Sequence, residues 1–338
     1  MPREHRRREP APGIFRLVLP LPVPELDRVN AYLLVGDEPI LVDCGMYSPD
    51  EAKDHGWSEI EAAFAAHGMS PGDVKHLLIT HPHIDHYGMA GRFVAETGCD
   101  LWMHQEAESD LEMYRNPRAV VDQLRAMFKD HGVSGDALDE LLEYEDVRIL
   151  ISDVIEPDRA LKGGERFKVG DREWEVVFTP GHSRAHVCPW SADDRILISG
   201  DHLLPTITPH IDFKRGEDED PLGDFLESLA KVERLDPSLV LPGHGHPFEE
   251  GAERARIIER HHDRRLGSIV QVIRNEPQTA EQITNEIFGT ELLHFQKRLA
   301  LGEALAHLAY LRQRGEVERI KNQDGVYVYK KVSRKQQS

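Results

Sequence analysis

Cysteine is scarce in this 338-residue sequence, which contains only Cys44, Cys99 and Cys188, and no pair has the CxxC spacing. So few and so scattered thiols argue against a disulfide framework and suit a reducing compartment. We therefore expect the three cysteines to be small buried residues that bind no metal.

Long apolar runs are also missing. No stretch approaches the roughly 20 apolar residues that a membrane-spanning helix requires. The basic start, MPREHRRREP, is not followed by the apolar run of a secretory signal. We interpret this start as a frayed tail, and we expect a cytoplasmic location without membrane contact.

Positive charge is in deficit, since the formal net charge is -19. Residues 268–338 carry 11 Lys+Arg and 8 Asp+Glu, a balance of +3, so the other 267 residues carry -22. An acidic chain argues against a surface built mainly for nucleic acid. The GxGxxG, P-loop and GxSxG patterns are absent as well, so neither an organic cofactor nor a serine nucleophile is indicated.

The patterns that are present indicate an α/β fold. Short apolar runs of strand length alternate with amphipathic helical patterns, which is typical of a layered α/β domain. The predicted strands are 30–36, 39–45, 76–80 and 99–104, together with the β-rich runs 173–182, 194–202 and 238–246, which end in Gly with His or Asp. The predicted helices are 57–68, 88–98 and 251–274.

Two segments depart from this alternation. Residues 106–158 are helical and charged, and we predict a helical insertion that either forms a lid or substrate wall or is a plain decoration. Residues 266–332 combine a capping box at Thr279–Gln282, a helix over 295–314 and a hairpin with an Asp324-Gly325 turn. Three helices followed by a hairpin predict a winged-helix domain.

The chemistry centres on the run His81-Pro82-His83-Ile84-Asp85-His86, which follows a predicted strand and precedes a helix. Imidazole and carboxylate ligands together suit Zn, Fe or Mn. Three further candidates, His182, Asp201 and His244, each lie beside a glycine just past a predicted strand. Because sites of α/β sheets form at the carboxyl ends of strands, we expect all these side chains to meet.

In these motifs the sequence resembles the metallo-β-lactamase superfamily over residues 13–265. The resemblance implies an αββα sandwich that holds two divalent metal ions, most often Zn²⁺, with Fe and Mn as alternatives. By resemblance, the first metal ion would be held by His81, His83 and His182, and the second metal ion by Asp85, His86 and His244. Asp201 would bridge the two ions. Asp43 would orient a ligand histidine.

Several branches of the superfamily share these features. TPGHSRAH and PGHGH are similar to motifs of the glyoxalase II and lactonase-like branches, although Arg184-Ala185 departs from them before His186. The segment 266–332 resembles the winged-helix extension of a hydrolase branch that includes endoribonuclease-type members.

The resemblance implies a hydrolase in which a metal-bridged hydroxide attacks a small ester, thioester or lactone substrate. Asp85 and Asp201 would be catalytic, with Asp85 also accepting a proton or orienting the water. Two alternatives remain open: an endoribonuclease or phosphodiesterase that holds RNA with the winged helix, and an iron-dependent persulfide dioxygenase. A homodimer is also left open.

Other residues are ambiguous. Tyr87 either donates a hydrogen bond to an oxyanion or packs under the motif. His202 and His210 either line the substrate pocket or are structural. His186 is expected to brace a loop, and His261 and His262, on a polar helix, are expected to be solvated.

Overall fold

The computed structural model describes residues 8–21, 27–48, 55–142, 150–213 and 219–332, so most of the basic start falls outside the described residues. The chain divides into two compact units. Unit 1 comprises residues 1–115, 146–209 and 228–256, and unit 2 comprises residues 116–145, 210–227 and 257–338. Among the described residues, none of the helices has the length and apolarity that crossing a bilayer requires.

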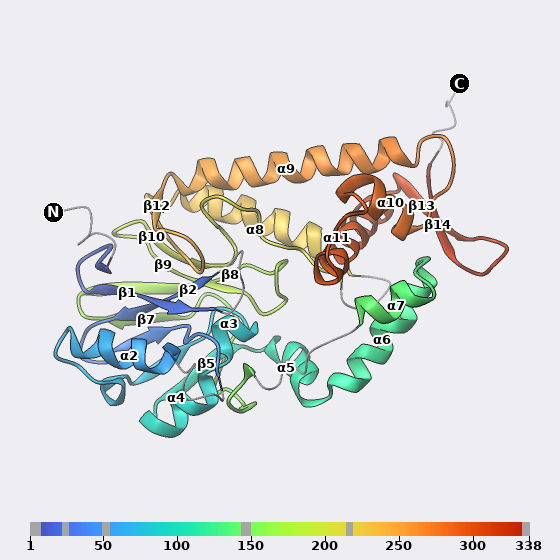
Figure 1. Cartoon of the computed structure of the whole chain (residues 1–338). Coiled ribbons are helices and arrows are strands. Elements are labelled where there is room, and N and C mark those ends of the chain that lie inside the picture. Colours follow the sequence, from blue (N-terminus) through green and yellow to red (C-terminus); the bar gives the residue numbers. More distant parts are fainter. Residues whose placement is uncertain (1–7, 22–26, 49–54, 143–149, 214–218, 333–338) are drawn as a thin grey trace. The chain divides into compact units, whose positions relative to one another are not determined.

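Unit 1 is built on two six-stranded sheets (Figure 1). The first sheet has the strand order β1 (Ile14–Pro20), β2 (Arg28–Leu34), β3 (Ile40–Val42), β4 (His76–Leu78), β5 (Asp100–His104) and β6 (Arg159–Leu161). Strands β1 to β3 are antiparallel, and β3 to β6 run parallel.

The second sheet has the order β12 (Phe248–Glu249), β11 (Leu239–Pro242), β10 (Ile196–Gly200), β9 (Val187–Ser191), β8 (Arg172–Phe178) and β7 (Arg166–Val169). Among these described strands, only β10 and β11 are parallel. Within each sheet, parallel neighbouring strands end at the same edge of the sheet. The candidate ligands lie just after strand ends at these edges, for example His81 after β4, Asp201 after β10 and His244 after β11.

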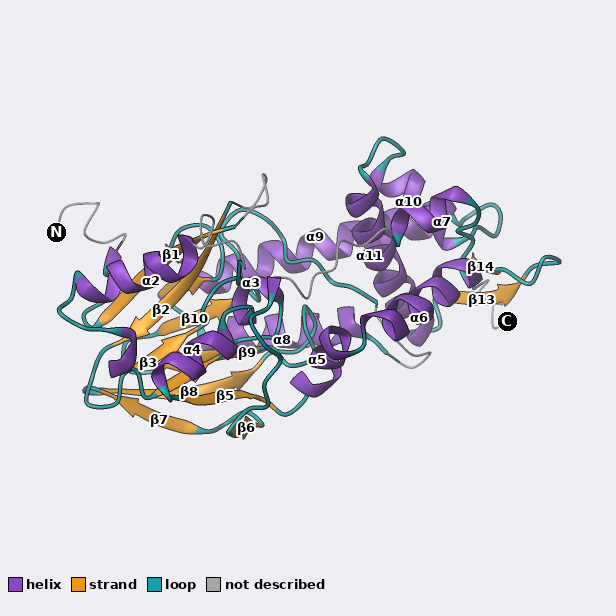
Figure 2. Cartoon of the chain, turned by 60° about the horizontal axis from the view of Figure 1, so that its bottom comes forward, coloured by secondary structure: helices purple, strands orange, loops and turns teal. Residues whose placement is uncertain are grey.

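Alternation along the strands creates two hydrophobic layers. Leu33, Leu41 and Leu77 pack toward the helices that cover the first sheet, α2 (His55–Ala65) and α4 (Ala90–Thr97). Leu34, Ile40 and Leu78, one position along, belong to the layer shared with Trp174, Val176 and Ile198 of the second sheet. Because successive side chains point to opposite faces, strands buried on both faces are apolar throughout. The predicted α/β sandwich is confirmed (Figure 2).

The segment between β5 and β6 is helical, as predicted, but it is divided between the units. Helix α5 (Ala107–Arg115) belongs to unit 1, whereas α6 (Pro117–Asp130) and α7 (Asp136–Leu141) belong to unit 2. Residues 143–149 of the predicted insertion lie outside the described part of the chain.

Unit 2 also contains α10 (Ala280–Phe288), α11 (His294–Gln313) and the hairpin of β13 (Val317–Lys321) and β14 (Tyr327–Lys331). Helices α8 (Pro221–Leu235) and α9 (Gly251–Val272) contribute residues to both units. Thr279 caps α10 through the predicted capping box, because its side chain accepts from the Gln282 N–H while the Gln282 side chain accepts from the Thr279 N–H.

Candidate metal centre

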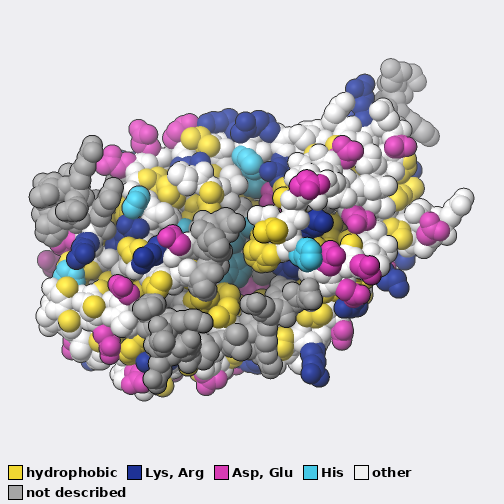
Figure 3. Space-filling model, viewed as in Figure 1, with side chains coloured by type: hydrophobic (Ala, Val, Ile, Leu, Met, Phe, Trp, Pro, Cys, Tyr) yellow, Lys and Arg dark blue, Asp and Glu magenta, His cyan; other side chains and the backbone are white. Residues whose placement is uncertain are grey.

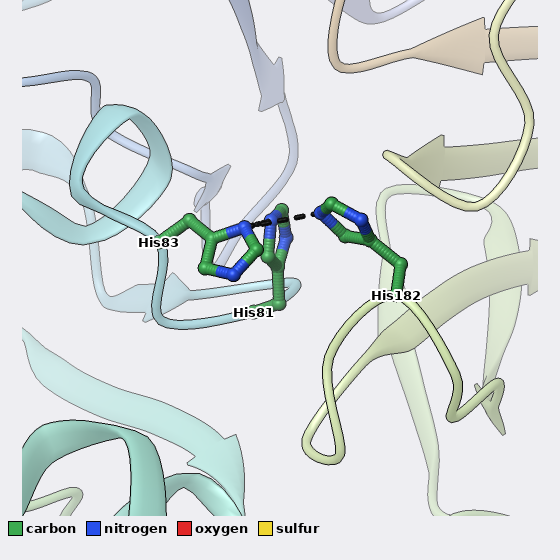
Figure 4. A group of neighbouring side chains, drawn as sticks. All are labelled: His81, His83 and His182. Atoms are coloured by element: carbon green, nitrogen blue, oxygen red, sulfur yellow. Dashed lines mark hydrogen bonds between the residues drawn. The ribbon is translucent and has the colours of Figure 1, made fainter. Parts of the chain in front are cut away.

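Three imidazoles of unit 1 converge from two loops. His81 and His83 follow β4, and His182 follows β8 (Figure 4). The Nδ1 atom of His83 lies 2.9 Å from Nε2 of His81 and 3.0 Å from Nε2 of His182. These ring nitrogens can hold one metal ion together.

A second group lies next to the first and is formed by Asp85, His86 and His244. The Oδ2 atom of Asp85 lies 3.1 Å from Nε2 of His244 and 3.7 Å from Nε2 of His86. Asp201 lies between the groups, because its carboxylate is 3.4 Å from His86, 3.5 Å from His244 and 3.7 Å from His182. The structure therefore brings together all seven side chains that the motifs had singled out.

Asp43 determines which nitrogen of two histidines faces this centre. One of its carboxylate oxygens accepts from Nδ1–H of His86 at 2.8 Å and from the Thr80 hydroxyl at 2.9 Å. Since the Thr80 hydroxyl donates its proton to Asp43, its oxygen accepts from Nδ1–H of His81 at 3.1 Å. With the protons of both rings at Nδ1, the Nε2 lone pairs of His81 and His86 face the centre.

His244 is held in the same tautomer, because its Nδ1–H donates to the carbonyl of Arg28 at 2.8 Å. Within the described residues, Nε2 of His86, Nε2 of His244 and Oδ1 of Asp201 are buried and have no partner in hydrogen-bond geometry. Buried polar atoms that lack such partners are rare, and here three of them face one another. This donor set fits divalent metal ions with nitrogen and oxygen ligands.

The local electrostatics agree with a site built for positive charge. Burial lowers the pKa of His244, but the carboxylates of Asp201 and Asp85 outweigh it and raise that pKa to about 10. Burial also lowers the pKa of His86, but the carboxylates of Asp85, Asp201 and Asp43 outweigh it and raise that pKa. Burial and the surrounding imidazoles instead lower the pKa of His81. The carboxylates thus attract cations to the half of the centre that contains His86 and His244.

Comparison with known proteins agrees with this geometry. The family model of the metallo-beta-lactamase superfamily matches residues 24–244, which contain all seven side chains. The chain belongs to the metallo-beta-lactamase superfamily. A second model, the metallo-beta-lactamase-like C-terminal domain, matches residues 266–332.

Two solved structures of this superfamily are similar over 95% of the chain. A metallo-beta-lactamase family protein from Thermus thermophilus shares 30% identity, with a TM-score of 0.80 and 99% of that chain covered. A beta-lactamase domain protein from Burkholderia ambifaria shares 34% identity, with a TM-score of 0.82 and 93% of that chain covered.

Among curated proteins, the probable metallo-hydrolase YqjP of Bacillus subtilis is 24% identical over 296 residues, covering 84% of this chain and 87% of its own length. The predicted enzyme class, a metallo-hydrolase of the metallo-beta-lactamase superfamily, is thereby confirmed.

Gly243 and His186 support the metallo-beta-lactamase centre without belonging to the donor set. A Cβ atom on Gly243 would lie 2.4 Å from Oδ1 of Asp201 and 2.7 Å from Cε1 of His86, so only glycine fits there. His186, fully buried, donates from Nδ1 to the Thr179 hydroxyl and accepts the Asp201 backbone N–H at Nε2, at 3.2 Å. The predicted bracing role of His186 is confirmed.

Helix α5 contributes two supports that the sequence did not reveal. The hydroxyl of Tyr114 donates to the carbonyl of Pro82, between His81 and His83, at 2.8 Å. The carboxylate of Asp110 accepts from the hydroxyl of Ser183, next to His182, at 3.0 Å. The first helix of the predicted insertion therefore anchors both histidine loops.

The ambiguous residues can now be assigned. Tyr87 is fully buried, and its hydroxyl contacts the backbone of Ile155 on both the N–H and the carbonyl side, so it packs under the motif and offers no proton to an oxyanion. His202 is also fully buried, and burial lowers its pKa to about 3. Of the two roles considered for His202, its burial favours the structural one over lining the substrate pocket. His210 belongs to unit 2, beside Asp212 and Glu303.

One expectation about α9 is wrong. His262 was expected to be solvated with His261, but its side chain is fully buried within unit 2. The aromatic ring of Phe225 and the imidazole of His307 pack against it, with ring centroids 5.6 Å and 5.2 Å away.

Proposed function

We propose that this metallo-hydrolase binds two divalent ions, most readily Zn²⁺, and hydrolyses a small ester, thioester or lactone. In this proposal His81, His83 and His182 hold one ion, Asp85, His86 and His244 hold the other, and Asp201 contacts both. The observation that carries the proposal is that Nδ1 of His81, of His86 and of His244 contacts Thr80, Asp43 and the Arg28 carbonyl respectively, which turns Nε2 of all three rings toward the centre. Nε2 of His86 and of His244 lies 3.4 Å and 3.5 Å from Asp201, and Nε2 of His81 lies 2.9 Å from Nδ1 of His83.

Two bound ions would supply Lewis acidity, which lowers the pKa of a water toward ~7 and polarises a carbonyl. The protein residues supply the remaining functions. Asp43 keeps the ligand rings in one tautomer, and the buried hydrogen bonds of α5 keep the histidine loops in place. The side chain of Asp85 is 19% exposed, so its carboxylate is accessible to accept a proton from water.

The distribution of charge favours a small acyl substrate over RNA. On the face drawn in Figure 3, acidic side chains are interspersed with the basic side chains of the described residues. Arg314, which directly follows α11, is paired with Asp220 at 2.9 Å and is not a free cation for RNA. We infer that α10, α11 and the β13–β14 hairpin form a winged helix with a structural role.

The test is turnover by the metal-loaded protein of a panel of thioesters, lactones and a bis-aryl phosphodiester. Asp201→Ala serves as the blank, and Asp73→Ala, on the exposed 3-10 helix Pro71–Asp73, is the matched control. We expect acyl turnover that Asp201→Ala loses and Asp73→Ala keeps. Turnover of the phosphodiester alone would overturn the proposal and make the α11 residue Arg312 the next target.

A further inference from the structure

A second group of metal-binding side chains lies wholly within unit 2. His262 of α9 and Glu303 and His307 of α11 offer ligand atoms that all lie within 4.8 Å of one another. Glu303 and His307 are one helical turn apart, so they share a face of α11, and α9 lies beside it (Figure 1). Both imidazoles are fully buried, and the Glu303 side chain is 15% exposed.

The hydrogen bonds of this group leave His262 unsatisfied. Nδ1–H of His307 donates to the Glu303 carbonyl at 2.7 Å, so its Nε2 carries a lone pair, 3.1 Å from Nδ1 of His262. Nε2 of His262 is buried and has no hydrogen-bond partner among the described residues. If the His262 proton is at Nδ1, the Nε2 lone pair is orphaned. If it is at Nε2, an N–H group is orphaned and two lone pairs face each other.

A cation bound by Nδ1 of His262 and Nε2 of His307 lies between the two facing lone pairs and replaces their repulsion by coordination. The proton of His262 is then at Nε2. Without a cation, either the facing lone pairs repel each other or the Nε2 lone pair of His262 has no partner among the described residues.

The charges suit a divalent metal ion. The imidazoles of His262 and His307 are buried, and the carboxylate of Glu303 pairs with the guanidinium of Arg265. Two neutral imidazoles and a carboxylate are a ligand set for Zn²⁺ and similar ions.

Arg265 has to share Glu303 with the ion. Its guanidinium lies 3.0 Å from Oε1 of Glu303, and His210 lies 3.6 Å from Oε2. A carboxylate has two oxygens and several acceptor positions, so it can hold the guanidinium with one oxygen and the ion with the other. Three protein ligands leave one tetrahedral position for water at the partly exposed carboxylate.

From these contacts we propose that His262, Glu303 and His307 form a divalent metal site that is separate from the catalytic centre. Because its ligands come from two neighbouring helices and are largely buried, the ion has a structural role and fastens α9 to α11. The proposal does not depend on the substrate of the hydrolase, since no residue of this group belongs to the centre in unit 1.

The experiment measures Zn²⁺ equivalents by equilibrium dialysis of the full chain, followed by metal analysis. Glu303→Gln keeps an acceptor for Arg265 and removes the anionic ligand, and His307→Gln is a second variant. His294→Gln, on the same helix with a side chain 54% exposed, is the matched control. All variants are also made in an Asp201→Asn background, which weakens binding in unit 1 and leaves unit 2 unchanged.

We expect Glu303→Gln and His307→Gln to lose one equivalent in both backgrounds, while His294→Gln loses none. The affinity should fall by ~100-fold or more, since a lost ligand costs more than a lost supporting contact. Zn²⁺ should raise the thermal midpoint of the Asp201→Asn chain, and Glu303→Gln should abolish that rise. Hydrolase turnover of the metal-loaded Glu303→Gln enzyme should be retained. Equal Zn²⁺ equivalents in wild type, Glu303→Gln and His307→Gln, each shown to be folded by circular dichroism, would overturn the proposal.

Discussion

Replacing Asp43 by asparagine tests whether one carboxylate controls the histidine tautomers. Asp43 has φ +60°, and asparagine tolerates this left-handed conformation better than other non-glycine residues, so the backbone should be preserved. The amide oxygen of the introduced asparagine can still accept the Thr80 N–H, which Asp43 accepts at 2.7 Å. The amide NH₂ then faces the Thr80 hydroxyl and Nδ1 of His86.

An NH₂ group at this place donates to Nδ1 of His86, so the ring proton moves to Nε2 and blocks the metal-facing lone pair. Loss of such a supporting contact costs about 10- to 100-fold in metal affinity. That factor corresponds to about 1.4–2.7 kcal/mol of binding free energy. Since the same NH₂ group can donate to the Thr80 hydroxyl, we also expect the ring of His81 to be reoriented.

The assay is competition for Zn²⁺ with a chromogenic chelator, together with urea unfolding of the metal-free chain. Asp73→Asn makes the same chemical change at an exposed capping residue and should leave the Zn²⁺ affinity unchanged. A folded Asp43→Asn protein with Zn²⁺ affinity equal to that of wild type would refute the tautomer argument.

Three further outcomes follow from contacts outside the donor set. Tyr114→Phe should lower the free energy of unfolding by about 1 kcal/mol and weaken Zn²⁺ binding a few-fold, because the Pro82 carbonyl loses its donor; urea unfolding and chelator competition measure both, and unchanged values would contradict the anchoring role. Gly243→Ala should reduce Zn²⁺ stoichiometry, since its methyl group would overlap Asp201 and His86; full stoichiometry by metal analysis would contradict this. His131 is buried, and burial lowers its pKa to about 3, below about 6.5 in the unfolded chain. Its contribution to stability is therefore complete above pH ~6.5 and declines as the pH falls toward 3, by about 2 kcal/mol at pH 5. Urea unfolding of His131→Gln between pH 7 and pH 5 should show a smaller decline than wild type, and equal declines would contradict the assignment.

The sequence predicted most of the strands and the seven metal-ligand candidates. It missed strand β9, whose composition argues against a strand. Strand β9 (Val187–Ser191) lies inside the second sheet yet contains Pro189, which argues against a central strand. Pro189 is paired on one side of β9, opposite Val176 of β8, whereas β9 pairs with β10 only through Trp190 and Ser191. The missing N–H of Pro189 therefore interrupts no hydrogen bond of the β9–β10 ladder.

Helix α9 shows a different limit. Charged residues occur around most of its circumference, so its pattern indicates a solvated helix. The burial of His262 comes from Phe225 and His307, and His307 lies 45 residues away along the chain. Such burial depends on tertiary packing, which periodicity within one helix does not predict.

The ligands of the centre and their supports differ in how strongly chemistry restricts the residue type. A divalent ion needs imidazole or carboxylate ligands, so the set recurs as a pattern that can be found in the chain. A support needs only one donor or one acceptor, which many side chains and every peptide group can provide. Tyr114 supports its loop through a backbone carbonyl, and Asp110 contacts Ser183 across 73 residues. No spacing links such pairs, so they become visible only when the fold brings α5 against the histidine loops.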